Sequence, residues 1–171
     1  ATYNLTRMNL VMRGIKPGNI DVRNADTLEE DWPRDERTPA PTLYLDAVVS
    51  NPPYSQPWNP NGKDLDPRYR YGVAPKGKAD YAFLLHDLYH LKPDGIMTIV
   101  LPHGVLFRGD AAKDEAEGVI RKNLIENNHL DAVIGLPADI FFANNKHAKH
   151  LQAHPYESLQ VQARLRKQHL A

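Results

Sequence analysis

Apolar and polar positions along this chain follow two periods, which predict strands separated by helices. Short runs rich in Val, Ile and Leu predict buried strands over 44–50, 96–101 and 130–136. Apolar residues at helical spacing predict helices over 2–13, 79–91 and 114–128. A short alternation of Ile20 and Val22 with charged residues predicts one more strand over 20–24. Strands that alternate with helices of about ten or more residues are typical of an α/β fold with a mostly parallel sheet.

The long segment 55–78 has no apolar period and is rich in Pro, Gly, Asn and charged residues. We expect a long loop here, with Trp58, Tyr69 and Tyr71 spaced along it. A loop of this length in a compact domain is usually functional or disordered. The segment could close over a substrate or form a solvated insertion, and its sequence is compatible with both.

The composition excludes several classes of protein. The chain has 171 residues, enough for about one domain with a real core. Lys and Arg number 21, as do Asp and Glu, so no overall basic charge attracts the chain to DNA. The absence of cysteine excludes disulfides and thiolate metal sites and fits a reducing cytoplasm. No apolar run approaches the roughly 20 residues of a membrane span, so we expect a soluble cytoplasmic protein with no membrane segment.

The predicted strand over 44–50 is followed at once by Asn51, Pro52, Pro53 and Tyr54. The prolines cannot extend a strand ladder, so they stiffen the turn and hold Asn51 and Tyr54 in fixed directions. In an open α/β sheet, ligands bind outside the carboxyl ends of the strands. Asn51 offers an amide oxygen and an NH2 group, and Tyr54 offers a flat face for stacking, which suits a flat, amino-bearing substrate. A purely structural turn is the alternative reading of these four residues.

Two acidic residues and one histidine pair are further candidates for chemistry. Asp26 follows the predicted strand over 20–24, where a role as a helix or turn cap is the simpler alternative. Asp80 lies in the first turn of a predicted helix, where a carboxylate also stabilises the helix dipole. His86 and His90 have the spacing of metal ligands, but the sequence suggests no third ligand, so we predict no metal site.

The segment from Ser50 to Tyr54 resembles the catalytic motif of S-adenosylmethionine-dependent amino-methyltransferases that modify the N6 atom of adenine. The surrounding sequence narrows this resemblance to the modification subunit of type I restriction-modification systems. Matching segments occur in family order: Thr2 to Leu5, Asp26 to Leu28, the motif itself, Lys78 to Phe83, Leu101 to Gly109, and Ile134 to Phe142. The resemblance implies a Rossmann-like α/β methyltransferase fold that is incomplete in this chain.

The resemblance also implies roles for particular residues. Asp26 would accept a hydrogen bond from the adenine amino group of S-adenosylmethionine, and Leu28 would form an apolar wall beside it. Asp80 and Asn51 would lie on the cofactor side of the site. Among the catalytic residues Asn51, Pro52, Pro53 and Tyr54, the Asn51 oxygen and the Pro52 carbonyl would accept hydrogen bonds from the substrate amine.

For the substrate, the resemblance implies an adenine that stacks on Tyr54. Either of two further aromatic residues, Phe141 and Phe142, would wall the opposite side of its pocket. The alternative for both phenylalanines is a place in the core or in an interface.

At the level of the whole protein, the resemblance implies a DNA adenine-N6 methyltransferase subunit that acts on double-stranded DNA. Its partners would be a specificity subunit and a restriction subunit. Two alternatives stay open. One is a methyltransferase of glutamine side-chain amides in proteins, because the same tetrapeptide suits any planar nitrogen. The other is an inactive fragment that only packs against partner subunits.

Two departures from the family pattern limit the match to about residues 1–142. No Gly-rich strand-to-helix turn precedes Ala1, although that turn supplies much of the family's cofactor site. Residues 143–171 also stop resembling the family and are rich in Gln, Arg and His. We therefore expect a partial catalytic domain over 1–142 and a divergent polar tail over 143–171. This tail would be disordered or would form a helix around Ser158 to Leu170.

Overall fold

The structure of the chain is a computed structural model that describes residues 2–30, 33–34, 39, 42–137 and 160–166. The chain divides into two compact units, Ala1–Trp32 and Pro33–Ala171. Within the described residues, no helix has the length and apolar character needed to cross a membrane.

The first unit contains the predicted N-terminal helix but not the predicted strand. Helix α1 spans Thr2–Met12 and is followed by Gly14 in the left-handed region, at a φ of +80°. The short helix η1 covers Pro17–Asn19, and residues 20–24 are not in a strand. That prediction was wrong because alternation alone does not make a strand, which also needs a neighbouring strand to complete its hydrogen bonds.

Apolar residues at helical spacing are normally core residues, and for α1 this expectation is wrong. Leu5, Met8 and Met12 are exposed by 53%, 55% and 77%. Helical spacing of apolar residues therefore predicted the helix correctly and its burial incorrectly.

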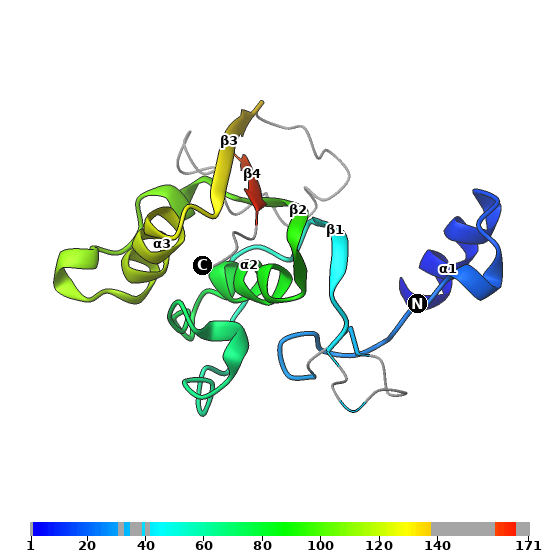
Figure 1. The fold of residues 1–171 in the computed structure, drawn as a ribbon, viewed down its shortest axis with the longest axis horizontal. Coiled ribbons are helices and arrows are strands. Elements are labelled where there is room, and N and C mark those ends of the chain that lie inside the picture. Colours follow the sequence, from blue (N-terminus) through cyan, green and yellow to red (C-terminus); the bar gives the residue numbers. More distant parts are fainter. Residues whose placement is uncertain (1, 31–32, 35–38, 40–41, 138–159, 167–171) are drawn as a thin grey trace, which may run out of the picture. The chain divides into compact units, whose positions relative to one another are not determined.

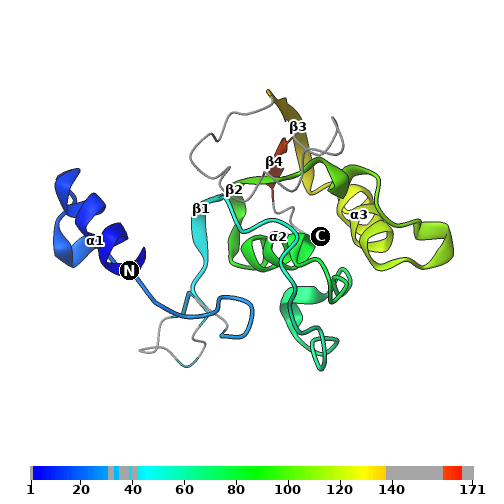
Figure 2. The same ribbon diagram turned by 180° about the vertical axis from the view of Figure 1, so that it is seen from behind.

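The second unit is built on a four-stranded sheet whose strands are β1 (Leu45–Ser50), β2 (Leu91–Pro102), β3 (Leu130–Leu136) and β4 (Gln160–Arg166). Their order across the sheet is β1-β2-β4-β3, and Figures 1 and 2 show this order from opposite sides. β1 pairs in parallel with β2, whereas β4 is antiparallel to both β2 and β3. β1, β2 and β3 therefore run in one direction, which agrees with the predicted mostly parallel sheet.

Strand β4 lies in the segment that was expected to be a disordered or helical tail. It pairs with β2 from Ile96↔Arg166 to Pro102↔Gln160, so it occupies an interior position of the sheet. The predicted helix was therefore wrong over Gln160–Arg166. The sequence contains a weak strand pattern here, because Val161, Ala163 and Leu165 alternate with Gln and Arg. In the structure, Leu165 is fully buried.

The core gathers around β2, which has neighbours on both sides. Met97, Ile99 and Leu101 project from one face of β2 and are at most 1% exposed. Helices α2 (Asp80–Tyr89) and α3 (Ala116–Glu126) confirm the two later predicted helices, and short helices η2, η3 and η4 cover Pro67–Tyr69, His103–Leu106 and Ala111–Lys113. β1 and β3 were expected to be buried, but none of their residues is, and Val49 of β1 is 88% exposed.

The segment over 55–78 is packed against the fold. Its aromatic residues Trp58, Tyr69 and Tyr71 are at most 9% exposed. The ring centroids of Trp58 and Tyr69 lie 5.3 Å apart, and the Trp58 indole N–H donates a hydrogen bond to the Pro75 carbonyl at 3.1 Å. The aromatic side chains thus anchor part of the segment by burial, whereas Leu65 between them is 94% exposed, so both interpretations stay open.

Candidate active site at the end of β1

The tetrapeptide follows directly on Ser50, the last residue of β1, so it lies at the carboxyl end of a strand that is parallel to its neighbour. Pro52 is buried, Asn51 is exposed, and Tyr54 is 37% exposed. The Tyr54 hydroxyl donates a hydrogen bond to Asn51 Oδ1 at 2.8 Å. The amide and the ring that the sequence singled out therefore lie together on an accessible surface.

The Tyr54 hydroxyl remains a hydrogen-bond donor at ordinary pH. Partial burial raises its pKa above the usual value of 10.0, so it is protonated at neutral pH. An amide oxygen has two lone pairs, and the Tyr54 hydroxyl uses one of them. Asn51 Oδ1 thus has capacity for one further donor, such as the N–H of an amine.

The residue after the tetrapeptide has an unusual backbone conformation. Ser55 has a φ of +49°, in the left-handed region that a non-glycine residue rarely adopts. Its backbone N–H donates a hydrogen bond to Asp80 Oδ1 at 2.7 Å. Asp80 is the first residue of α2 and is only 1% exposed, so the helix holds this turn through a buried carboxylate.

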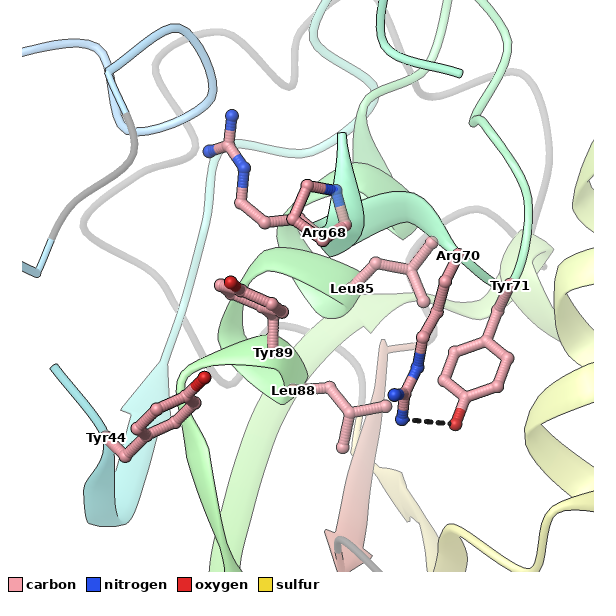
Figure 3. A pocket seen from close by; sticks show the side chains of 8 residues that line it. Tyr44, Arg68, Arg70, Tyr71, Leu85, Leu88 and Tyr89 are labelled. Carbon is pink, nitrogen blue, oxygen red and sulfur yellow. Dashed lines mark hydrogen bonds between the residues drawn. The ribbon is translucent and has the colours of Figure 1, made fainter. Parts of the chain in front are cut away.

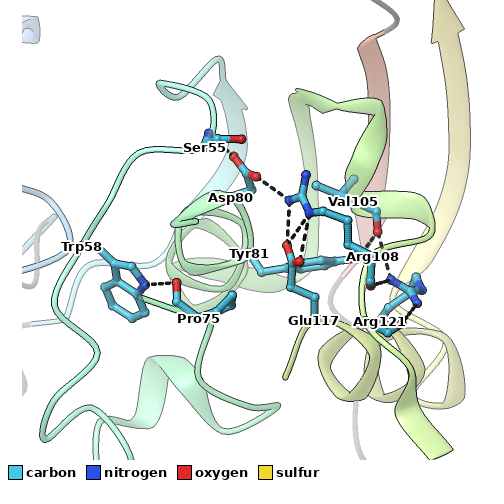
Figure 4. A network of polar contacts seen from close by, with 10 residues as sticks. Ser55, Trp58, Pro75, Asp80, Tyr81, Val105, Arg108, Glu117 and Arg121 are labelled. Carbon is cyan, nitrogen blue, oxygen red and sulfur yellow. Dashed lines mark hydrogen bonds and ion pairs between the residues drawn. The ribbon is translucent and has the colours of Figure 1, made fainter. Parts of the chain in front are cut away.

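The other oxygen of Asp80 is paired with Arg108 (Figure 4). Arg108 Nη2 lies 2.6 Å from Asp80 Oδ2 and 2.6 Å from Glu117 Oε1, and Arg108 Nε donates to both oxygens of Glu117 at 2.9 and 3.1 Å. Burial alone would lower the pKa of Arg108, but the hydrogen bonds and charges of Glu117 and Asp80 outweigh it and raise that pKa. One partly buried cation therefore links the start of α2 to the first turn of α3.

Two glycines let the segment that carries Arg108 lie directly on α3. Gly109 adopts a φ of +74°, and a Cβ atom at Gly118 would lie 2.5 Å from the Ala111 backbone N and 2.7 Å from the Asp110 carbonyl carbon. Arg121 of α3 also donates hydrogen bonds to the Arg108 carbonyl at 2.7 Å and the Gly109 carbonyl at 2.9 Å. This close approach fixes Arg108 between Asp80 and Glu117.

A second acid on α2, Asp87, interacts with the side chain of Ser50, the residue before the tetrapeptide. Burial raises the pKa of Asp87 to about 6, although the interaction with Ser50 acts in the opposite direction. Among the described residues, Asp87 Oδ2 has no hydrogen-bond partner, so its charged form is poorly compensated.

The remaining predicted site residues are placed as follows. Asp26 is exposed, and its Oδ1 accepts a hydrogen bond from the Leu28 backbone N–H at 3.0 Å, as in the cap that was the simpler alternative. Leu28 is 2% exposed. Phe141 and Phe142 lie outside the described residues. The cofactor contact expected of Asp80 stays a prediction, and its burial and its two partners favour a different role.

His86 of α2 and His90, the residue after its last turn, have partners within the protein. The rings of His86 and His90 lie 4.7 Å apart. His86 Nδ1 is 3.1 Å from Arg68 Nη1, and His90 Nδ1 is 2.9 Å from the Leu43 carbonyl oxygen. In the part of the chain that the structure describes, no three His, Cys, Asp or Glu side chains are grouped to bind a metal ion.

Two cavities lie away from the tetrapeptide. A cavity of about 110 Å³ is lined by side chains of η2, α2 and their neighbours (Figure 3). Beside it, Arg70 Nη2 donates to the Tyr71 hydroxyl at 2.6 Å, and that hydroxyl is 2.6 Å from His129 Nε2. An apolar cavity of about 230 Å³ lies among α2, α3 and the sheet. The lining of neither cavity includes Asn51 or Tyr54.

Sequence reasoning missed Arg108, Glu117 and Asp87. Arg108 and Asp80 are 28 residues apart, and no spacing rule links positions that far apart. The only available signal was the match of the segment Leu101 to Gly109 to the family, which contains Arg108 but does not name a partner for it.

The fold and the strand-end motif define the class of α/β methyltransferase domains. The structure resembles that of the methyltransferase subunit of a type I restriction-modification system from Streptococcus thermophilus. The TM-score is 0.80 and the sequence identity 47%, over 99% of this chain and 32% of that protein. The EcoKI M protein has the same fold, with a TM-score of 0.59 at 23% identity over 95% of this chain and 28% of that protein.

The sequence model of the N-6 DNA Methylase family matches residues 1–150, and the chain belongs to this family. The MpnII methylase subunit of Mycoplasma pneumoniae, a type I restriction enzyme, is 40% identical over 146 residues, which cover 82% of this chain and 26% of the relative. The MjaIX methylase subunit of Methanocaldococcus jannaschii is 35% identical over 147 residues, which cover 82% and 24%. The chain thus spans about a quarter of the length of these curated relatives.

Proposed function

We propose that the complete protein is the modification subunit of a type I restriction-modification system and transfers a methyl group to adenine N6 in DNA. The observation that carries this proposal is the Tyr54–Asn51 pair at the carboxyl end of β1, held on an accessible surface with a hydrogen bond of 2.8 Å. Membership of the N-6 DNA Methylase family supports the reaction, and the names of the relatives support the type I class.

The chemical task of the tetrapeptide is to activate an amine. The exocyclic nitrogen of adenine is a poor nucleophile because its lone pair is delocalised into the ring. Asn51 Oδ1 and the Pro52 carbonyl would each accept a hydrogen bond from this NH2 group, which returns electron density to the nitrogen. Tyr54 would stack on the base. Catalysis then consists of positioning and electrostatics, without a covalent enzyme intermediate.

The cofactor in this proposal is S-adenosylmethionine, which supplies an electrophilic methyl group when bound. The described residues fit it in part. Asp26 is exposed and uses Oδ1 for the Leu28 N–H, so Oδ2 is available to accept a hydrogen bond from an adenine amino group. Leu28 is 2% exposed, so it offers almost no accessible apolar surface to a cofactor. Asp80 fits less well as a direct ligand because its two oxygens contact Ser55 and Arg108.

The DNA and protein partners follow from the same proposal. A base inside a duplex is out of reach, so the adenine must be flipped out at a cost of a few kcal/mol. The chain has a formal net charge of +0, so most of the attraction to phosphate would come from elsewhere in the complex. We expect a specificity subunit to select the sequence, a restriction subunit to complete the assembly, and the complex to act in the cytoplasm.

The test is methyl transfer from labelled S-adenosylmethionine by the full-length subunit assembled with its partners. Asn51→Ala should lower the rate on DNA by about 10²-fold or more, because one acceptor for the amine is lost, while the cofactor Kd changes little. Asn59→Ala is the control, since Asn59 is an exposed asparagine in the segment that follows the tetrapeptide. Retention of the rate by Asn51→Ala would refute the assignment. If the complex methylates a glutamine-containing peptide and not DNA, the proposed substrate class, DNA, is wrong.

A further inference from the structure

The residue that follows the tetrapeptide has a backbone conformation that few non-glycine residues adopt. Three non-glycine residues have a positive φ in the described part of the chain, namely Ser55, Asp114 and Asn128. Asp and Asn tolerate this conformation because their short side chains bond to the local backbone, whereas Ser is a less usual choice. Ser55 follows Tyr54 directly, so its conformation sets the direction in which the chain leaves the catalytic turn.

Asp80, at the start of α2, binds the backbone of Ser55. Its Oδ1 accepts the Ser55 N–H at 2.7 Å, and the side chain is 1% exposed. Its Oδ2 is held by Arg108 at 2.6 Å, and Arg108 is held in turn by three contacts of 2.6 to 3.1 Å with Glu117. Both oxygens of Asp80 are therefore held in place by hydrogen bonds.

Helix α2 interacts with residues on both sides of the tetrapeptide. Asp80 accepts a hydrogen bond from the residue after Tyr54, and the side chain of Ser50, the residue before Asn51, acts to lower the pKa of Asp87. Asp80 and Asp87 are about two helical turns apart, so both lie on the same face of α2.

We propose that Asp80 is a positioning residue for methyl transfer, which orients Asn51 and Tyr54 through the Ser55 N–H and is itself held by Arg108 and Glu117. This inference rests on the proposed function. It assigns Asp80 a role that differs both from direct cofactor binding and from simple stabilisation of the α2 dipole.

The experiment compares Asp80→Ala and Asp80→Asn in the full-length subunit assembled with its partners. Asn retains an oxygen that can accept the Ser55 N–H, whereas Ala removes it. The matched control is Asn123→Ala, since Asn123 of α3 donates a part-buried hydrogen bond to the Tyr71 carbonyl at 2.9 Å and does not contact the tetrapeptide. Each variant is measured for single-turnover rate at saturating cofactor, cofactor Kd, thermal midpoint, and amide hydrogen exchange over 51–55.

We expect Asp80→Ala to lower the single-turnover rate about tenfold or more and to speed amide exchange over 51–55, with a cofactor Kd within about threefold of the wild type. Asp80→Asn should recover much of the rate and of the protection. Asn123→Ala should lower the thermal midpoint without changing either quantity. If Asp80→Ala does not fold, Glu117→Gln is used in its place, because it loosens Arg108 and should lower the rate by a smaller factor.

Two results would overturn the inference. The first is a large rise in cofactor Kd with an unchanged rate at saturation, which would make Asp80 a cofactor ligand. The second is a lower thermal midpoint with an unchanged rate and unchanged exchange over 51–55, which would make its role purely structural. Amide exchange needs no substrate, so it tests the positioning role even if the wild-type complex does not methylate DNA. Absence of DNA methylation by the wild-type complex would refute the proposed function and not this inference.

Discussion

Replacing Arg108 by leucine tests whether its ion pairs with the buried Asp80 and Glu117 contribute strongly to the free energy of unfolding. The substitution removes the cation that lies 2.6 Å from oxygens of both Asp80 and Glu117. The side chains of these two acids are only 1% and 8% exposed. Arg108→Leu therefore leaves two carboxylates close to each other, with little water and no positive charge to compensate them.

The expected cost follows from this burial. Breaking a buried pair by removing one partner typically costs about 3–5 kcal/mol, because an uncompensated charge remains. Arg108 is itself 17% exposed, so some water can enter, and we expect a loss of about 3 kcal/mol in the free energy of unfolding. Lys92→Met is the matched control, because Lys92 Nζ lies 2.7 Å from Asp46 Oδ1 but the side chains are 47% and 86% exposed. A surface pair of this kind contributes roughly 0–1 kcal/mol.

The assay is urea-induced unfolding of the full-length protein, followed by circular dichroism, for the wild type and both variants. The double variant Arg108→Leu/Glu117→Gln should regain about 1 kcal/mol relative to Arg108→Leu, because only one unpaired carboxylate remains. If Arg108→Leu costs no more than Lys92→Met, the two short ion pairs are equivalent and the reasoning from burial is wrong.

Two further substitutions test separate features of the same unit. Burial raises the pKa of Asp87 to about 6, so the folded state keeps a proton that the unfolded chain has released, and stability should fall as pH rises from about 4 to 6. Asp87→Asn keeps an acceptor for Ser50 and should remove this fall, with a gain of about 1–3 kcal/mol at pH 8 in urea unfolding; an unchanged pH dependence would refute the assignment. Gly118→Ala places a Cβ atom 2.5 Å from the Ala111 backbone N, and should lower stability by about 1–3 kcal/mol. Gly135→Ala is its control in thermal unfolding, with nothing within 4 Å of the added atom, and equal midpoints for the two variants would contradict the packing argument.

The helices and three of the strands could be predicted because their signals are local. Apolar residues at helical spacing lie where α2 and α3 form, and the runs rich in Val and Ile lie where β1, β2 and β3 form. The burial of individual side chains was less predictable, since it depends on which other elements cover that face of the helix or strand. Met12 of α1 and Val49 of β1 are apolar and exposed by 77% and 88%.

Strand β4 shows where local reasoning failed. Its residues alternate over only seven positions and include two arginines, so the pattern is weak against a polar background. The segment forms a strand because β2 and β3 both offer it hydrogen-bonding partners. The sequence of this segment does not show that such partners exist, because they are present only when the two neighbouring strands have formed.

The sequence by itself determined the parts of this protein that act over a few residues. It placed an amide, two prolines and an aromatic ring at the end of a strand, and the hydrogen bond between Tyr54 and Asn51 spans only three positions. The tertiary structure alone decided what holds that turn, since Ser55 meets Asp80 across 25 positions and Asp80 meets Arg108 across 28. The physical reason is that periodicity and turn chemistry constrain neighbours along the chain, whereas a buried ion pair forms only where packing excludes water and brings distant charges together.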